Sequence, residues 1–409
     1  MDDLLFLSHR MPYPPEKGDK IRSWHILRHL AARYRVHLGC FYDDPDDAQH
    51  IPTLAATCAS VNCVPLVPLT ARVRSLGALA TGESLSAAYF RDARLMRWIA
   101  ETLARHRPRR AFVFCSAMAP YLDDYRFDTR VIDLVDVDSE KWRQYAEISR
   151  FPMRAIYRRE AATLLALETR AARNFDYTLL STAAEARLFG KRAGDDVGAV
   201  LAMRNGVDHD FFKPGDSYPC PYPDGRRRIV FTGAMDYRPN IEAALWFIAE
   251  VMPLLRQNGT AADFWIVGAH PVPALLGAQT EDVYVTGRVD DMRPYLAHSD
   301  AVVAPLQIAR GIQNKVLEGM AMARPVVASP GALEGLDVKI GSEVLLATAA
   351  QDFAAGIAAI FDGTMSGLGG RARDRIESDY GWPAALRVLD DVFADMVPAL
   401  PIPALASAS

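Results

Sequence analysis

Hydrophobic and polar residues follow two alternating periods along the chain, and these predict strands and helices in turn. Short apolar runs have the length of buried strands, and the longer segments between them carry apolar residues at helical spacing. The first such pair is an apolar run at 4–7 and a helical pattern over 21–34. The apolar positions of this helix are Ile21, Trp24, Leu27, Leu30, Ala31 and Tyr34. Alternation of this kind predicts a parallel sheet covered by helices.

The same alternation runs through both halves of the chain. Further strands are predicted at 36–41, 111–115 and 131–135 in the first half, and at 229–232, 264–267, 283–286, 301–304 and 325–328 in the second. Between the halves lies a weakly periodic passage rich in proline and glycine, which is typical of a linker. We therefore predict a Rossmann-like α/β domain at 1–200, a linker at 201–225, a second such domain at 226–380, an amphipathic helix at 381–397 and a frayed tail at 398–409.

Composition narrows the class of protein. The 409 residues suit two domains, and with 50% apolar and 23% charged residues the chain is predicted to be globular. A formal net charge of −4 argues against nucleic acid as a partner. The start of the sequence lacks the pattern of a signal peptide, and no apolar run approaches the ~18 residues of a membrane helix. Five cysteines without metal-ligand spacing favour a reducing, cytoplasmic setting.

The segment 311–328 carries the clearest chemistry. It joins the strand at 301–304 to a helix through Gly311, Ile312, Gln313 and Asn314. The first N–H groups of a helix lack internal partners and carry partial positive charge, so such a corner binds anions. Arg310 and Lys315 add positive charge where a first turn usually favours acids, which a bound diphosphate would explain. Glu318 follows at helical spacing, and its carboxylate suits two hydroxyl groups of a ribose. The alternative is an ordinary Lys and Glu pair on a solvated helix face.

These residues resemble the donor site of the retaining glycosyltransferases of family 4. The resemblance covers nearly the whole chain, because it also includes 204–208 (Arg-Asn-Gly-Val-Asp), 231–233 (Phe-Thr-Gly) and 285–289 (Val-Thr-Gly-Arg-Val). The segments 12–23 and 131–142 resemble a narrower group, the glycosyltransferases of bacterial exosortase (PEP-CTERM) exopolysaccharide loci. The family has the GT-B architecture, in which two Rossmann-like domains with parallel sheets face each other and a C-terminal helix crosses back to the first domain.

The resemblance implies an activity and a role for each site residue. The expected reaction moves a sugar from a nucleotide-diphosphate sugar, with retention, to a hydroxyl of a lipid-linked glycan, without a metal or another cofactor. Glu318 would hold the ribose, and the backbone of Gly311, Ile312, Gln313 and Asn314 would hold the phosphates. Lys315, helped by Arg238, would neutralise the leaving diphosphate, and Arg288 and Val289 would border the base. In the first domain, the residues themselves suggest that Gly18 would let the donor or acceptor approach the backbone closely, and that Asp136 would serve the acceptor side or act as a base.

The sequence departs from the family at two positions. Many members carry a second glutamate eight positions before the one that matches Glu318, and this chain has Arg310 there. The usual arginine and lysine after the glycine that matches Gly233 are missing at their spacing, so Arg238 is the nearest cation. A non-catalytic nucleotide-sugar-binding or scaffold protein of the same fold, or a sugar-nucleotide epimerase, therefore remains an alternative.

Four further patterns each have two interpretations. The cations Lys17, Lys20 and Arg22 around Gly18 either face a ligand or belong to a surface loop. Asp133, Asp136 and Asp138 at a strand end could hold a divalent metal or cap the next helix. Arg150, Arg154 and Arg158 lie along one helical face that could contact anionic lipid on the inner side of the membrane, or could be solvated. Residues 367–372 match the G-x-G-x-x-A dinucleotide fingerprint, but they follow a predicted helix instead of a strand, which argues against an oxidoreductase.

Overall fold

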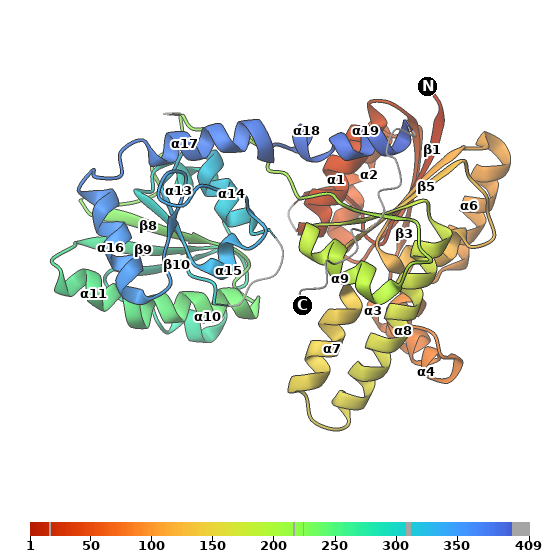
Figure 1. Ribbon diagram of the computed structural model, residues 1–409, viewed down its shortest axis with the longest axis horizontal. Helices are drawn as coiled ribbons and strands as arrows, with labels where there is room; N and C mark the ends of the chain where they lie inside the picture. The colour runs from red at the N-terminus through yellow and green to blue at the C-terminus, as the bar shows by residue number, and fades with distance from the viewer. Residues whose placement is uncertain (16–17, 216, 224, 308–311, 395–409) are drawn as a thin grey trace, which may run out of the picture. The chain divides into compact units, whose positions relative to one another are not determined.

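The computed structural model describes residues 1–15, 18–215, 217–223, 225–307 and 312–394. It divides the chain into two compact units, Met1–Arg204 with Leu386–Ser409, and Asn205–Ala385. Each unit is an α/β layer structure built on one parallel sheet with helices on both faces, as Figure 1 shows. The prediction of two Rossmann-like domains is therefore confirmed.

The first unit is built on a seven-stranded sheet in the order β3-β2-β1-β4-β5-β6-β7. All neighbouring pairs are parallel. Its strands are β1 Asp3–Ser8, β2 Arg35–Tyr42, β3 Ser60–Pro65, β4 Arg110–Phe114, β5 Thr129–Val135, β6 Tyr177–Leu180 and β7 Ala199–Ala202. Its helices are α1 Gly18–Ala31, α2 Ile51–Thr57, α3 Pro68–Leu76, α4 Ala78–Thr81, α5 Leu85–Tyr89, α6 Ala93–His106, α7 Asp138–Ile148, α8 Met153–Asn174 and α9 Ala183–Ala193.

The second unit is built on a six-stranded sheet in the order β10-β9-β8-β11-β12-β13. Its strands are β8 Arg227–Thr232, β9 Ala262–Val267, β10 Val283–Gly287, β11 Ala301–Ala304, β12 Val326–Ala328 and β13 Leu345–Leu346. Its helices are α10 Arg238–Trp246, α11 Met252–Gln257, α12 Pro273–Leu276, α13 Arg293–Ala297, α14 Asn314–Ala321, α15 Pro330–Leu333, α16 Ala350–Phe361, α17 Leu368–Arg375 and α18 Trp382–Ala385.

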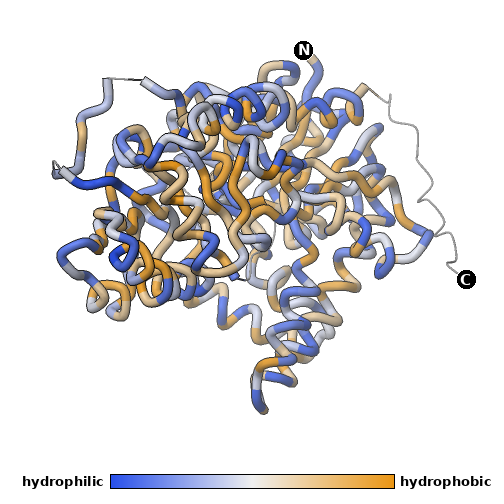
Figure 2. The backbone as a smooth tube through the Cα atoms, turned by 60° about the vertical axis from the view of Figure 1, so that its left-hand side comes forward, coloured by the Kyte–Doolittle hydropathy of each residue, from blue (hydrophilic) through white to orange (hydrophobic). Residues whose placement is uncertain are grey.

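The central strands of both sheets are buried on both faces, which explains their continuous apolar sequences. Leu4, Leu5, Phe6 and Leu7 of β1 are all fully buried. In Figure 2 the hydrophobic colour is concentrated on such interior segments of the chain. The apolar runs in the sequence therefore locate the middle of each sheet.

The last helix belongs to the first unit. After α18, the chain continues as α19 (Arg387–Phe393), which buries Leu389, Val392 and Phe393. His29 Nε2 of α1 lies 2.8 Å from Asp390 Oδ1, and the Tyr34 and Phe393 rings pack with centroids 5.7 Å apart. The predicted return of the chain to the first domain is confirmed, although the helix predicted at 381–397 is divided into α18 and α19. Met396 and the predicted tail lie outside the described residues.

Four strands were missing from the prediction, namely β3, β6, β7 and β13. Three of them are sheet edges, and β3, β7 and β13 are largely half-buried or exposed, so no continuous apolar run marks them. Within the part of the chain that the structure describes, no helix is long and apolar enough to cross a lipid bilayer.

Candidate functional site

The second sheet reverses its strand order between β8 and β11. From β8 the chain continues through α10 to β9 on one side, whereas β11 and β12 lie on the other side. Ligands of open α/β sheets bind outside the carboxyl ends of the strands at such a switch point. Helix α10 follows β8, and helix α14 follows β11. Both helices therefore begin at this edge of the sheet, and they supply the side chains described next.

Lys315 is buried at the start of α14. Its Nζ donates a hydrogen bond to Asn240 Oδ1 at 2.7 Å and lies 5.0 Å from the centroid of the Phe231 ring. No carboxylate forms an ion pair with Lys315 among the described residues. Burial lowers the pKa of Lys315 to about 8, although the Glu318 carboxylate acts in the opposite direction. A buried cation without an anionic partner in contact is costly, and a bound anion would relieve that cost.

Asn240 is a site residue that the sequence did not reveal. It is buried in α10, and its Nδ2 donates to Ala234 O at 2.9 Å while its Oδ1 accepts from Lys315. The amide thus orients the lysine from the opposite side of the switch point. The available signal was weak, since it consisted of one polar residue near the start of a helix, where asparagine has low helix propensity.

Two glycines allow this close packing. Gly233 directly follows β8 and has a φ of +151°, and a Cβ there would lie 2.7 Å from Asn240 Nδ2 and 3.5 Å from Lys315 Cε. Gly268 follows β9 with a φ of +157°, and its Cβ would lie 1.7 Å from Gly233 O. Larger residues would therefore displace the backbone beside Lys315. The glycine at 233 is explained by this contact as well as by its match to the family pattern.

Glu318 lies one turn after Lys315 in the same helix and is half-buried. Burial raises the pKa of its carboxyl group to about 7, and Lys315 acts against that rise. No described residue donates a hydrogen bond to the Glu318 carboxylate. Its two oxygens are therefore available to hydroxyl groups of a ligand.

The start of α14 has the features of an anion site. Gln313 is the N-cap residue and provides no side-chain cap, and Ile312 is buried beside it. Asn314 Oδ1 is buried and has no hydrogen-bond partner among the described residues. Gly311 and Arg310 lie outside the described residues.

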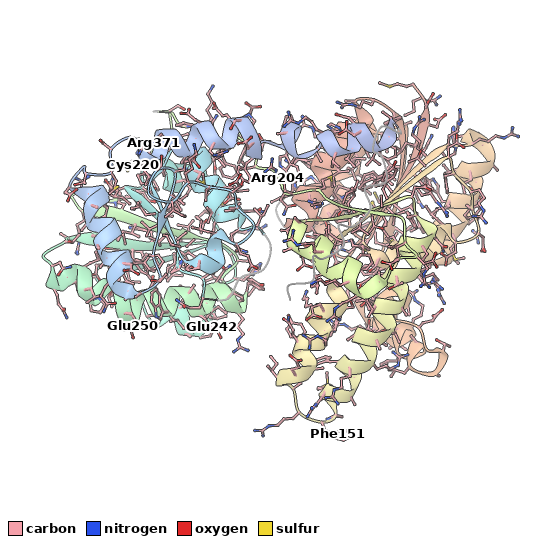
Figure 3. All side chains as sticks on the ribbon, in the orientation of Figure 1. Phe151, Arg204, Cys220, Glu242, Glu250 and Arg371 are labelled. Carbon is pink, nitrogen blue, oxygen red and sulfur yellow. The ribbon has the colours of Figure 1, made fainter. Side chains whose placement is uncertain are left out.

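The other predicted donor-side residues belong to the start of α10 and to the segment just after β10. Arg238, the first residue of α10, is exposed and donates to Glu242 Oε1 at 2.7 Å, so its present partner is on its own helix. Arg288 is exposed just after β10, at the carboxyl end of that strand, and Val289 packs against the core of the second unit. Figure 3 labels Glu242 on the surface of the second unit.

The first sheet has its own switch point between β1 and β4, and Gly18 begins the helix that follows β1. Gly18 is exposed, and a Cβ at this position would meet nothing within 4 Å. The nearby cations are engaged inside the unit, since Lys20 Nζ lies 2.8 Å from Asp47 Oδ2 and Arg22 Nε lies 2.7 Å from Asp133 Oδ2. Neither the ligand-facing interpretation nor the surface-loop interpretation fits these two buried side chains. Lys17 lies outside the described residues.

The three aspartates in and just after β5 have different surroundings. Asp133 is fully buried against Arg22, whereas Asp136 is exposed and accepts from Ser181 Oγ at 2.7 Å. Burial raises the pKa of Asp138, which opens α7. The capping interpretation is wrong, because the N-cap residue is Val137 and the start of the helix is held by Glu168, which accepts from Ser139 N and Oγ.

A cavity of about 300 Å³ opens at the opposite, amino edge of the second sheet. Its lining includes Arg227, Arg324 and the glycine-rich turn at 367–370. This turn follows α16 and begins α17, so the G-x-G-x-x-A match does lie between two helices, as the sequence indicated. None of the predicted donor-site residues that the structure describes lines the cavity.

Comparison with protein families identifies the second unit. Residues 226–362 match the family model described as "Glycosyl transferases group 1". This range contains Asn240, Lys315 and Glu318. The chain therefore carries a glycosyl transferases group 1 domain, as expected for a glycosyltransferase. No protein with a curated function matches the chain significantly.

Comparison with solved structures confirms the GT-B fold over nearly the whole chain. A sucrose-phosphate synthase from Thermosynechococcus elongatus has a TM-score of 0.69 and 16% identity, covering 97% of this chain and 99% of that one. Anabaena HepE, solved in complex with UDP and glucose, has a TM-score of 0.66 and 16% identity over 97% of this chain and 100% of that one. WaaG, a glycosyltransferase involved in lipopolysaccharide biosynthesis, has a TM-score of 0.62 and 15% identity over 95% and 99%.

Proposed function

We propose that the protein is a retaining glycosyltransferase that moves a sugar from a nucleotide-diphosphate sugar to a hydroxyl of a lipid-linked glycan in bacterial exopolysaccharide biosynthesis. The group 1 domain and the GT-B fold support the reaction class. The observation that carries the donor site is the buried Lys315, whose ammonium is held by Asn240 and has no anionic partner in contact among the residues that the structure describes. We infer that a bound anion would be the partner of the Lys315 ammonium.

Stabilisation of the leaving group would supply much of the catalysis. In this proposal Lys315 neutralises charge that develops on the diphosphate, and the N–H groups at 312–314 and the unpartnered Asn314 side chain surround it. Glu318 accepts two hydrogen bonds from the ribose, and Arg288 and Val289 border the base. A preorganised pocket of this kind needs no metal ion. Arg238 would assist only after exchanging Glu242 for a phosphate.

The first unit would supply the acceptor side. Asp136 is exposed at the carboxyl edge of the first sheet, and its contact with Ser181 leaves it able to accept a proton or a hydroxyl hydrogen bond. Gly18 is exposed at the same edge, where the open space around its Cα lets a ligand approach the backbone. Both roles rest on the family resemblance and on this position in the sheet.

The α7–α8 hairpin supports contact with a membrane. It extends away from the first sheet in Figure 1, and Figure 3 labels Phe151 at its far end. Phe151 is 86% exposed and Ile148 is 74% exposed, and Tyr145 and Met153 are exposed beside them. Exposed apolar side chains at the end of a protrusion can enter the headgroup region of a bilayer.

Cations flank this apolar tip. Arg150, Arg154 and Arg158 are exposed, and none of the three forms an ion pair with another described residue. Each arginine near an anionic surface contributes about 1 kcal/mol to binding. An apolar tip surrounded by unpaired arginines therefore fits the anionic inner face of a bacterial membrane, where a lipid-linked acceptor would be found.

A second apolar face strengthens this assignment. Helix α3 exposes Leu69, Val73 and Leu76 at helical spacing. The segment after α3 is tied to α8 of the hairpin, because Arg159 Nη2 donates to Glu83 O at 3.0 Å. The two apolar surfaces thus belong to connected parts of the first unit.

The donor-site proposal is tested by thermal stabilisation with UDP, GDP, ADP, dTDP and CMP, because a ligand selective for the native state raises its stability. UDP is the first choice, given the UDP complex of HepE. The protein is compared with Glu318→Ala and, as a matched control, Glu250→Ala, which removes an exposed glutamate between α10 and α11. We expect one preferred diphosphate, with its effect lost only in Glu318→Ala. No stabilisation by any nucleotide, or equal stabilisation of both variants, would contradict the assignment.

The reaction itself is tested with the matching sugar nucleotide and membrane extract as acceptor. Sugar transfer with a retained anomer is expected. Nucleotide binding without transfer would instead support the non-catalytic alternative, and a change of the sugar without transfer would support the epimerase. An inverted product would remove retention from the proposal.

A further inference from the structure

A group of polar side chains at the amino edge of the first sheet is not used by the proposed reaction. Asp3 begins β1, His37 lies in β2 and His106 ends α6. One ligand atom from each of the three lies within 4.8 Å of the other two. This edge is opposite to the carboxyl ends of the strands, where Gly18 and Asp136 lie. The group is therefore separate from the proposed acceptor side.

The sheet register brings these side chains onto one face. Asp3 pairs with Arg35 and Leu5 pairs with His37 in the β1–β2 register, so Asp3 and His37 are diagonal neighbours two residues apart. His37 in turn pairs directly with Ser60 of β3. Side chains at this spacing share a face of the sheet. The end of α6 covers that face, because the His37 and His106 rings stack with centroids 4.2 Å apart.

The hydrogen bonds around His37 are those of a metal ligand with its outer partner in place. His37 is fully buried, its Nε2 lies 2.9 Å from Asp3 Oδ1, and its Nδ1 lies 2.7 Å from Ser60 Oγ. Metal-binding histidines commonly donate the second ring N–H to an oxygen that fixes the ring. Ser60 is placed to accept that hydrogen bond when Nε2 binds an ion.

His106 has no structural role that explains its position. Its ring is half-buried on His37, and neither ring nitrogen forms a hydrogen bond with a described residue. Two imidazoles and a carboxylate make up the donor set that zinc and its neighbours in the first transition row prefer.

We propose that Asp3, His37 and His106 form a binding site for a divalent transition-metal ion, with zinc as the best match to the ligands and a fourth position open to water. The ion would replace the proton shared between His37 and Asp3. Arg35 Nε lies 3.6 Å from Asp3 Oδ1, and its half-exposed side chain can move into solvent when the carboxylate binds the metal.

Such an ion would stabilise the first unit without taking part in glycosyl transfer. It would tie the first strand of the chain to β2 and to the end of α6, three segments that are far apart in the sequence. Because metal binding to the native state alone adds to its stability, the midpoint of thermal unfolding should rise with zinc concentration. The same ion should not change the affinity of the donor site for a nucleotide.

The test uses tag-free, full-length protein treated with a chelator and then titrated with Co²⁺ and Zn²⁺. We expect one Co²⁺ per chain, with the visible absorption of a four-coordinate ion, and displacement of that signal by Zn²⁺ but not by Mg²⁺. Zn²⁺ should raise the midpoint of thermal unfolding of the metal-free protein by several degrees.

The variant His106→Ala tests whether the bound ion occupies this site. Because His106 makes no hydrogen bond with a described residue, its loss should leave the fold intact. Arg105→Ala, which removes an exposed side chain from the same turn of α6, is the matched control. Loss of Co²⁺ binding and of the Zn²⁺ effect in His106→Ala alone supports the site. Absence of stoichiometric binding in the parent protein, or equal binding in all three proteins, overturns it.

Discussion

Lys315 Nζ and Asn240 Oδ1 lie 2.7 Å apart, although three strands of the second sheet separate their helices in the sequence. The Asn240 amide is itself fixed, because its Nδ2 donates to Ala234 O. The lysine is thus held by a neutral acceptor that does not compete with a bound anion for its charge. The pair joins the two halves of the switch point into one site.

Replacing Asn240 should weaken donor binding without removing any group expected to touch the donor. Asn240→Ala leaves the Lys315 ammonium without its acceptor, and we expect about a tenfold loss of nucleotide affinity, equivalent to about 1.4 kcal/mol. Isothermal titration with the preferred diphosphate measures the loss. Glu250→Gln, which changes an exposed glutamate between α10 and α11, should bind like the parent protein. Unchanged affinity in Asn240→Ala would show that Lys315 is positioned without it.

The affinity for a nucleotide diphosphate should be highest between about pH 7 and pH 8. Diphosphate binding favours the protonated Lys315, whose pKa burial lowers to about 8, so affinity should fall above that pH. Ribose binding favours the ionised Glu318, whose pKa burial raises to about 7, so affinity should also fall below that pH. Titration calorimetry at several pH values measures both slopes.

Two variants test which residue causes the loss of affinity on each side of this pH range. Lys315→Arg should remove the alkaline decrease, because arginine stays charged at every pH used. Glu318→Gln should bind less tightly and should lack the decrease near pH 7, leaving only the titration of the phosphate itself near pH 6. Parallel profiles for the parent protein and Lys315→Arg would mean that another group controls the alkaline side.

An alanine at position 233 should damage both stability and donor binding. Its φ of +151° is strained for any L residue, at a cost of about 1–3 kcal/mol, and its Cβ would displace Asn240. Urea unfolding and nucleotide titration measure the two effects. Gly18→Ala is the contrasting case, because its Cβ meets nothing within 4 Å, and its stability should match that of the parent protein. Equal stability of both variants would contradict this account of Gly233.

The buried ion pair of Arg22 and Asp133, close to the switch point of the first sheet, should contribute strongly to the free energy of unfolding of the first unit. Arg22 Nε and Nη2 lie 2.7 and 3.1 Å from the two Asp133 oxygens. Arg22→Met leaves a buried carboxylate unpaired and should cost about 3–5 kcal/mol, measured by urea unfolding at pH 8.

The pH dependence of this loss has a definite sign. Burial raises the pKa of Asp133 even with Arg22 present, and removal of the arginine should raise it further. The native variant then binds a proton that the unfolded chain releases, so its stability falls as pH rises and its deficit should be smaller at pH 5 than at pH 8. A deficit independent of pH would indicate lost packing instead of an unpaired charge.

Polar replacement of the hairpin tip should release the protein from anionic membranes. The double variant Ile148→Ser and Phe151→Ser removes two side chains that would each contribute about 1.5–3 kcal/mol when fully buried in lipid. We expect at least a tenfold loss of binding in sedimentation with vesicles of anionic phospholipid. Leu276→Ser, which alters an exposed leucine of the second unit, is the control. Equal binding of both proteins would exclude the tip as the membrane contact.

Sequence patterns predicted those features that depend on one continuous segment of the chain. The apolar runs at 4–7 and 301–304 mark strands that are buried on both faces, and the Lys315–Glu318 spacing places both residues on one helix. Edge strands such as β3 and β7 were missed, because a half-exposed strand does not need a continuous apolar run. The hydrophobic pattern of the sequence therefore predicts the central strands of each sheet better than its edge strands.

Contacts between distant segments explain what the sequence could not predict. Lys20 and Arg22 resembled ligand-facing cations, but their partners Asp47 and Asp133 come from other elements of the same unit. Asn240 was overlooked for the same reason, since its importance depends on a lysine 75 positions later. Spacing along one helix cannot reveal a partner brought in by the fold of the sheet.

Because α19 packs within the first unit, that unit cannot be completed early during synthesis. Residues up to 204 leave the ribosome before the second unit, and Leu389, Val392 and Phe393 follow only after it, a delay of roughly 10 to 40 s at ordinary rates of synthesis. The second unit is one continuous segment and can finish folding in that interval. The nascent chain should therefore expose the α1 surface around Tyr34 until α19 has emerged, and a chaperone that binds apolar surface would find it there.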